Sequence, residues 1–159
     1  MLDGFIITAA IGGIDMLLIA HRGNVSGPRT EFENNPIYID KAIELGYDVE
    51  IDVWYKGGEW FLGHDGPEKY VVLDFLKNDK LWCHAKNIDA LNEMLKEEIH
   101  CFWHQEDDVT LTSKGYMWTY PGEQLTDNSI CVLPEKNKEI PKKVFGICSD
   151  FIVNYKETK

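Results

Sequence analysis

Seven short apolar runs, rich in β-branched and aromatic residues, recur along this chain, and the segments between them constrain its fold. The expected strands cover residues 16–21, 48–54, 81–85, 100–105, 116–120, 129–133 and 145–153. Helical patterns separate the early strands: Asn35-Pro36 begins one that ends at Gly46, and Asn87 caps a second over 88–99. From about residue 107 the connections are too short for full helices. We therefore predict an α/β fold, an abbreviated TIM-type (β/α) barrel with reduced helices in the second half.

Length and charge limit the function classes. The 159 residues fit a single domain spanning 1–159, shorter than the roughly 250 residues of a full (β/α)₈ barrel. The formal net charge of −11 argues against a nucleic-acid partner, because phosphate backbones demand dense Lys and Arg. An acidic protein that handles a phosphate must concentrate its cations, or a metal, locally.

The amino-terminal residues 1–15 are apolar but carry two aspartates and no basic residue. They match neither a secretory signal nor a membrane span, so we expect no stable membrane insertion. Whether they are an extra leader segment or an additional strand stays open.

The four cysteines lie far apart, each within an apolar run, and no CxxC pair occurs. Structural zinc is therefore not expected. Buried free thiols in a reducing compartment are the simplest interpretation, and they predict a cytoplasmic location.

The segment DVEIDVW at 48–54 combines strand character with buried charge. Residues two apart share a face, so Asp48, Glu50 and Asp52 point one way and the apolar residues between them the other. Buried like charges repel strongly, and a divalent metal such as Mg²⁺ or Ca²⁺ would neutralise them. The alternative is an edge strand with a solvated acidic face.

Further polar residues follow the other expected strands. His64-Asp65 comes just after an expected hairpin turn at Gly57-Gly58, where a lone histidine is more often a surface residue. His84 and Lys86 share a face of the strand at 81–85, although a strand-end lysine can also reach solvent. His104 and Glu106 either add to the site or cap the following turn.

In this order and spacing the residues resemble the glycerophosphodiester phosphodiesterase family, in the barrel superfamily that also holds the phosphatidylinositol-specific phospholipases C. The resemblance covers residues 16–65 well and the Lys86 strand moderately. It rests on His21-Arg22-Gly23, Glu33-Asn34, Gly46, Glu50-x-Asp52, His64-Asp65 and Lys86. The segment GICSDF is also similar to the final strand of the family, which closes with an aspartate.

The resemblance implies a metal-dependent phosphodiesterase of lipid metabolism that acts on a small glycerophosphodiester-like substrate. His21 and His64 would be its catalytic acid/base pair. Arg22 and Lys86 would bind the phosphate, and Glu33, Glu50, Asp52 and His84 would surround the metal, Mg²⁺ or Ca²⁺. A substrate hydroxyl next to the phosphate would attack first and leave a cyclic phosphate for water to open.

Three departures distinguish this chain from the family. His84 stands where the family usually has a metal-binding glutamate, so either the metal differs or Glu106 supplies the missing oxygen. The covering segment that usually follows the His-Asp pair is short, and so is the whole chain. A degenerate barrel that binds a phosphorylated ligand without turnover is therefore the main alternative. A structural protein with an aromatic interface and a metallo-hydrolase of amides or esters are weaker alternatives, and the sequence leaves the oligomeric state open.

Overall fold

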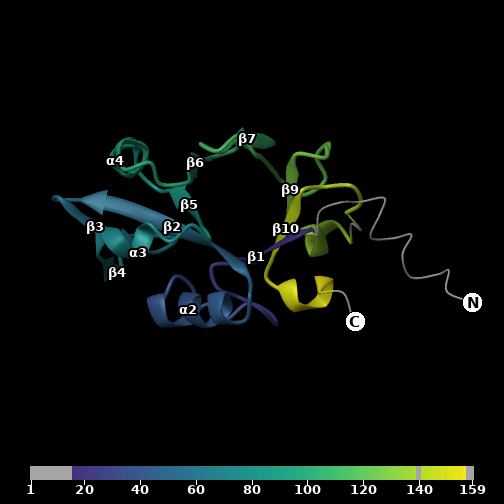
Figure 1. Cartoon of the computed structure of the whole chain (residues 1–159), viewed down its shortest axis with the longest axis horizontal. Helices are drawn as coiled ribbons and strands as arrows, with labels where there is room; N and C mark the ends of the chain where they lie inside the picture. Colours follow the sequence, from purple (N-terminus) through teal and green to yellow (C-terminus); the bar gives the residue numbers. More distant parts are fainter. Residues whose placement is uncertain (1–15, 139–140, 157–159) are drawn as a thin grey trace, which may run out of the picture.

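The computed structural model describes residues 16–138 and 141–156, so the expected leader or strand over 1–15 lies outside the described residues. The described chain contains strands and short helices arranged around a curled sheet (Figure 1). Its elements are β1 (Leu17–His21), α2 (Pro36–Glu44), β2 (Asp48–Lys56), β3 (Glu59–Leu62), β4 (Lys69–Val71), α3 (Leu73–Leu76), β5 (Leu81–Ala85), α4 (Ile88–Lys96), β6 (Cys101–Trp103), β7 (Val109–Leu111), β8 (Met117–Thr119), β9 (Ser129–Val132), η1 (Pro134–Asn137), β10 (Gly146–Ser149) and η2 (Ile152–Tyr155).

Seven of the strands form a parallel series in the order β6-β5-β2-β1-β10-β9-β8. Strand β1 therefore lies beside β10, and β7 adds to β8 in the antiparallel direction. Strands β3 and β4 continue from β2 as antiparallel hairpins. The predicted mixed α/β fold is confirmed, as a curled half-barrel sheet with few helices.

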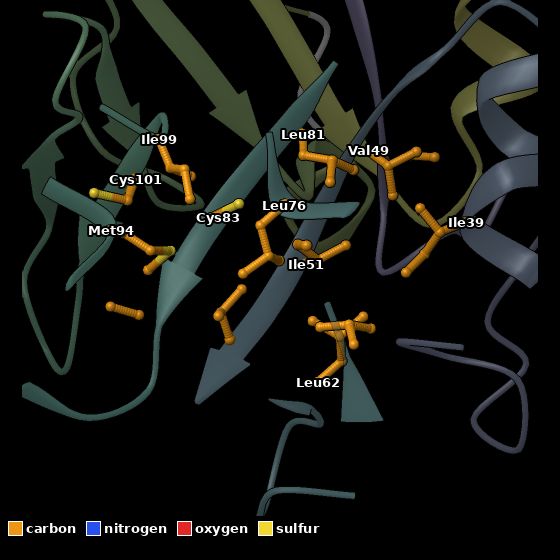
Figure 2. Close-up of a cluster of buried hydrophobic side chains, with 14 of the residues drawn as sticks. Ile39, Val49, Ile51, Leu62, Leu76, Leu81, Cys83, Met94, Ile99 and Cys101 are labelled. Atoms are coloured by element: carbon orange, nitrogen blue, oxygen red, sulfur yellow. The ribbon is translucent and has the colours of Figure 1, made fainter. Parts of the chain in front are cut away.

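Helices α2 and α4, together with the short α3, cover the outer face of the sheet. The Asn35 side chain accepts a hydrogen bond from Ile37 N at the start of α2, and Asn87 accepts one from Ala90 N at the start of α4. Apolar residues of both helices are buried against β2, β3 and β5 in one cluster, part of which Figure 2 shows. Full burial stabilises each large side chain by roughly 1.5–3 kcal/mol.

A second apolar cluster lies on the opposite face of the strands and is dominated by aromatic rings. Phe102 of β6 stacks on Trp118 of β8 with ring centroids 4.7 Å apart, and His104 stacks on Tyr120 at 3.7 Å. Among the described residues no backbone ladder joins β6 to β8. Side-chain stacking therefore connects these two strands. The buried members of this cluster are Ile19, Trp82, Phe102, Trp118, Ile130, Val132, Leu133 and Cys148.

The hairpin turn at Gly57-Gly58 is confirmed, with φ of 62° and 83° at the two glycines. The expected strand over 145–153 is wrong in its second half. β10 ends at Ser149, and the chain turns into the 3₁₀ helix η2. The reason is local: the Ser149 hydroxyl accepts a hydrogen bond from Phe151 N at 2.9 Å, which closes a turn instead of continuing the ladder.

Among the described residues after α4, the only helices are the 3₁₀ helices η1 and η2, as the short connections predicted. All four cysteines are buried. None of the described helices is both long and apolar enough to cross a membrane.

Candidate active site

The polar residues predicted from the sequence gather at the carboxyl ends of the parallel strands, around a cavity of about 570 Å³. Seven of the eight predicted site residues line this cavity, and the eighth, Asp52, is fully buried beside them. The seven are His21, Arg22, Glu33, Glu50, His64, His84 and Lys86. Parallel strands produce this convergence because their carboxyl ends meet at one edge of the sheet.

The deepest part of the site is a cluster of Glu50 and Asp52 from β2 and His84 from β5. Each offers one ligand atom, and these atoms all lie within 4.8 Å of one another. His84 pairs with Asp52 in the ladder, which places His84 Nδ1 3.2 Å from Asp52 Oδ1 and 3.9 Å from Glu50 Oε1. Glu50 Oε2 and Asp52 Oδ1 are buried without a hydrogen-bond partner among the described residues.

The two carboxylates have opposite electrostatic environments. Burial raises the pKa of Glu50, and the charge of Asp52 raises it further. Burial alone would also raise the pKa of Asp52, but the neighbouring His84 imidazole and the Arg22 guanidinium outweigh burial and lower it. Asp52 is thus the carboxylate of the cluster that stays ionised.

Asn34 holds Asp52 in place. Its side-chain amide donates to Asp52 Oδ2 at 2.9 Å, and its amide oxygen accepts from Asp52 N at 2.9 Å. Asn34 adopts a left-handed conformation with φ of 57°, which asparagine tolerates well. The Glu33-Asn34 pair therefore forms an edge of the site before the helix begins.

His21 ends β1 and is oriented by an aspartate from the other end of the chain. Its Nδ1 lies 2.8 Å from Asp150 Oδ1, and its Nε2 lies 3.7 Å from Glu50 Oε2. Burial alone would lower the pKa of His21, but the hydrogen bond to Asp150 and the charge of Glu50 outweigh it and raise the pKa. Asn24 donates to the same Asp150 oxygen at 2.9 Å.

Arg22 bridges two acidic residues. Its Nη1 lies 3.2 Å from Glu33 Oε2, and its Nε lies 3.1 Å from Asp52 Oδ2. The backbone at Arg22 has φ of 54°, so the chain turns sharply as soon as β1 ends. Gly23 continues the turn with φ of 90°, and a Cβ there would lie 2.8 Å from Tyr38 Cδ1. The turn sets the direction of the guanidinium.

Of the remaining two predicted residues, Lys86 is about as buried as Arg22, and His64 lies nearer to solvent. Lys86 Nζ lies 3.9 Å from Asp52 Oδ1, directly after β5. His64 follows β3, its Nδ1 lies 2.7 Å from Asp65 Oδ1, and its side chain is 46% exposed. Gly63 anchors that loop, because its N–H donates to Asp52 O and its carbonyl accepts from Trp54 Nε1.

Two residues considered with the site lie outside it. Asp48 shares the face of Glu50 and Asp52, but it lies at the start of β2, where its carboxylate accepts from Trp82 Nε1 at 2.9 Å and contacts Lys80. Glu106 is exposed and is not among the cavity-lining residues. His84 is therefore the residue that β5 contributes to the acidic cluster.

Sequence reasoning missed Asn24 and Tyr120 and gave no contact for Asp150. Asn24 connects Glu33 to Asp150 with one amide group, at 2.8 and 2.9 Å. Tyr120 lines the cavity, and its position two residues after the inward Trp118 was a usable signal. The contact of Asp150 with His21 spans 129 residues, and no local pattern encodes it.

The charges of the site leave room for a cation. Four carboxylates (Glu33, Glu50, Asp52 and Asp150) lie at this cavity, and three permanent cations among the described residues line it: Arg22, Lys86 and Lys136. The negative charges exceed the permanent positive charges by one, and a neighbouring imidazole offsets that excess only when it is protonated. A divalent metal would offset it, and the two unpartnered oxygens of Glu50 and Asp52 are suitable ligand atoms. The residues present therefore fit a metal ion.

Comparisons with protein-family models, with curated proteins and with solved structures found no match for this chain.

Proposed function

We propose that this protein is a metal-dependent phosphodiesterase built on an abbreviated TIM-type barrel and related to the glycerophosphodiester phosphodiesterases. One observation carries the proposal. His21, His64, Arg22 and Lys86 line a single cavity, and the Glu50–Asp52–His84 cluster lies at that same cavity. Two imidazoles, two phosphate-binding cations and a metal-binding cluster are the groups that hydrolysis of a phosphodiester requires.

A phosphodiester is an anion, and its negative charge must be neutralised as the attacking group approaches. Arg22 is suited to this task because its planar guanidinium can contact phosphate oxygens while Glu33 at Nη1 and Asp52 at Nε hold it in place. Lys86 supplies a second positive charge as a point donor. A metal held by Glu50, Asp52 and His84 would supply Lewis-acid stabilisation of the phosphate oxygens.

The proton transfers fall to the two histidines. With Nδ1–H of His21 donated to Asp150, its Nε2 is the atom free to accept a proton from the attacking hydroxyl. His64 is the candidate general acid, because its exposed imidazole reaches the cavity with Nδ1 held by Asp65. Attack by a hydroxyl of the substrate itself would break the bond from phosphorus to the other alcohol, which would leave with the proton from His64. The cyclic phosphate that remains would then be opened by water.

A hydrolysis screen tests the proposal. The demetallated protein is loaded in turn with Mg²⁺, Ca²⁺, Mn²⁺, Co²⁺ and Zn²⁺ and incubated with glycerophosphodiesters, and ³¹P NMR follows conversion of the diester into cyclic phosphate or monoester. The proposal expects turnover with at least one dication and none in excess EDTA. Ligand binding without turnover in every arm would instead support the degenerate barrel.

A further inference from the structure

Given the metal role proposed above, the ligand atoms of the Glu50–Asp52–His84 cluster also bear on which kind of metal binds. We infer that His84 binds the ion through Nδ1 and makes this a site for a nitrogen-accepting transition-metal dication, of the Zn²⁺ or Co²⁺ type, in preference to Mg²⁺ or Ca²⁺.

The contact of His84 with a backbone carbonyl defines its tautomer. Its Nε2 lies 3.2 Å from the backbone carbonyl oxygen of His104. A carbonyl oxygen can only accept a hydrogen bond, so Nε2 carries a proton and donates it. In the neutral ring the lone pair is therefore on Nδ1. A metal-binding histidine typically has this arrangement, with the remote N–H donated to a carbonyl or carboxylate.

The Nδ1 atom of His84 faces two carboxylates. It lies 3.2 Å from Asp52 Oδ1 and 3.9 Å from Glu50 Oε1, both oxygens of buried carboxylates. Despite its nearness to Nδ1, Asp52 Oδ1 has no hydrogen-bond partner among the described residues. An unprotonated Nδ1 this close to carboxylate oxygens is repelled unless a cation, either a proton on Nδ1 or a metal ion, lies between them. The three atoms are therefore directed at a shared position for a positive ion.

The His84 ring is held rigidly by its neighbours. The His84 ring stacks on Phe102 with centroids 5.1 Å apart and planes 10° from parallel, and Phe102 stacks in turn on Trp118. The carbonyl of His104 fixes the remaining rotation of the ring. The imidazole nitrogen is thus held in place before any metal arrives, which lowers the entropic cost of binding.

The three ligand atoms of the cluster favour one class of metal ion. One imidazole nitrogen with two carboxylates suits first-row transition ions, whereas Mg²⁺ and Ca²⁺ prefer oxygen ligands throughout. The exposed Glu106 lies outside the cavity lining, so it does not add the oxygen that would favour Mg²⁺. The imidazole of His84 is therefore the group that decides the metal class.

Direct metal binding to the full chain tests this inference without any assay of turnover. Isothermal titration of the demetallated protein compares Co²⁺, Zn²⁺, Mn²⁺, Mg²⁺ and Ca²⁺, and the visible spectrum of the Co²⁺ form reports nitrogen ligation. We expect Co²⁺ and Zn²⁺ to bind at least about tenfold more tightly than Mg²⁺. We expect the His84→Gln variant to lose this preference for Co²⁺ and Zn²⁺ over Mg²⁺. Circular dichroism should show that its fold is retained.

Two further variants sharpen the result. His84→Glu replaces the nitrogen by oxygen and should shift the preference toward Mg²⁺ and Ca²⁺, whereas His64→Gln removes another imidazole of the same cavity and should leave metal affinity unchanged. Equal affinity for Mg²⁺ and Co²⁺ in the wild type, or an unchanged preference in His84→Gln, overturns this inference alone. Absence of binding by every dication overturns it together with the metal role in the proposed function.

Discussion

His21 Nδ1 and Asp150 Oδ1 lie 2.8 Å apart although 129 residues separate them in the sequence. The contact exists because β1 and β10 are neighbours in the sheet, with Ala20 opposite Ser149. The two residues that follow that pair therefore emerge side by side at the rim of the cavity. An aspartate in this position fixes which nitrogen of the imidazole faces the cavity.

Replacing Asp150 by asparagine should reduce kcat/KM for a phosphodiester by roughly 10²- to 10⁴-fold, because the amide no longer selects the Nδ1–H tautomer. The pKa of His21 should also fall, since the hydrogen bond and the charge of Asp150 both raise it. NMR titration of the metal-free protein measures this pKa. Asp65→Asn is the matched control. Its pair with His64 is exposed, so we expect a much smaller loss. Equal losses in the two variants would contradict the special role of Asp150.

The same pair should stabilise the fold within a limited pH window. Burial alone would raise the pKa of Asp150, but its hydrogen bond with His21 lowers it, so its contribution exists above about pH 4 and is lost as the pH falls through the lowered pKa. The pKa of His21 is raised, so its contribution exists below pH 6.5 and is lost as the pH rises through the raised pKa. Denaturant unfolding should therefore show the largest difference between wild type and Asp150→Asn from about pH 4 to pH 6.5. A difference that keeps growing above pH 8 would contradict this assignment.

The turn after β1 makes a prediction about backbone conformation. Gly23→Ala should destabilise the protein by roughly 2–3 kcal/mol, because alanine at φ of 90° is strained and its Cβ would lie 2.8 Å from the Tyr38 ring. Gly46→Ala is the control, with φ of 94° and nothing within 4 Å of the added Cβ, and should cost only about 1 kcal/mol. Thermal unfolding of both variants measures the difference. Equal costs would show that Tyr38 moves aside and that the turn is not locked.

Glu50 and Asp52 should respond oppositely to neutralisation in the metal-free protein. Burial and the charge of Asp52 raise the pKa of Glu50, so Glu50→Gln should increase the free energy of unfolding at pH 7. The pKa of Asp52 is lowered because Arg22 and His84 outweigh its burial, so Asp52→Asn should decrease the free energy of unfolding by roughly 1–3 kcal/mol. Both variants should lose metal affinity. Destabilisation by Glu50→Gln would mean that its carboxylate is fully compensated without a metal.

The sequence contained much of this site because strands encode it with a period of two. Glu50 and Asp52 alternate with buried apolar residues, and His84 and Lys86 repeat the same spacing on β5, so their shared direction was predictable. The position of Asp48 outside the site was not predictable. Periodicity gives the face of the strand on which a residue lies, but not how far that residue is from the carboxyl end. The Asp150 contact and the stacking of His104 on Tyr120 depend on which strands become neighbours. That arrangement is set by long-range packing, and the end of β10 is set by a serine hydroxyl that apolar patterning does not register.

The most direct test of the central proposal is phosphodiester turnover by His21→Asn and His64→Asn beside the wild type, each loaded with the dication that gives the wild type its highest rate. Circular dichroism and metal titration first establish that the fold and the metal affinity are retained, and ³¹P NMR then follows the disappearance of the diester. We expect wild-type turnover and a loss of at least about 10²-fold in each variant, the share that a general acid or base contributes. Wild-type rates in either variant, or no turnover by the wild type with any dication, would contradict the account.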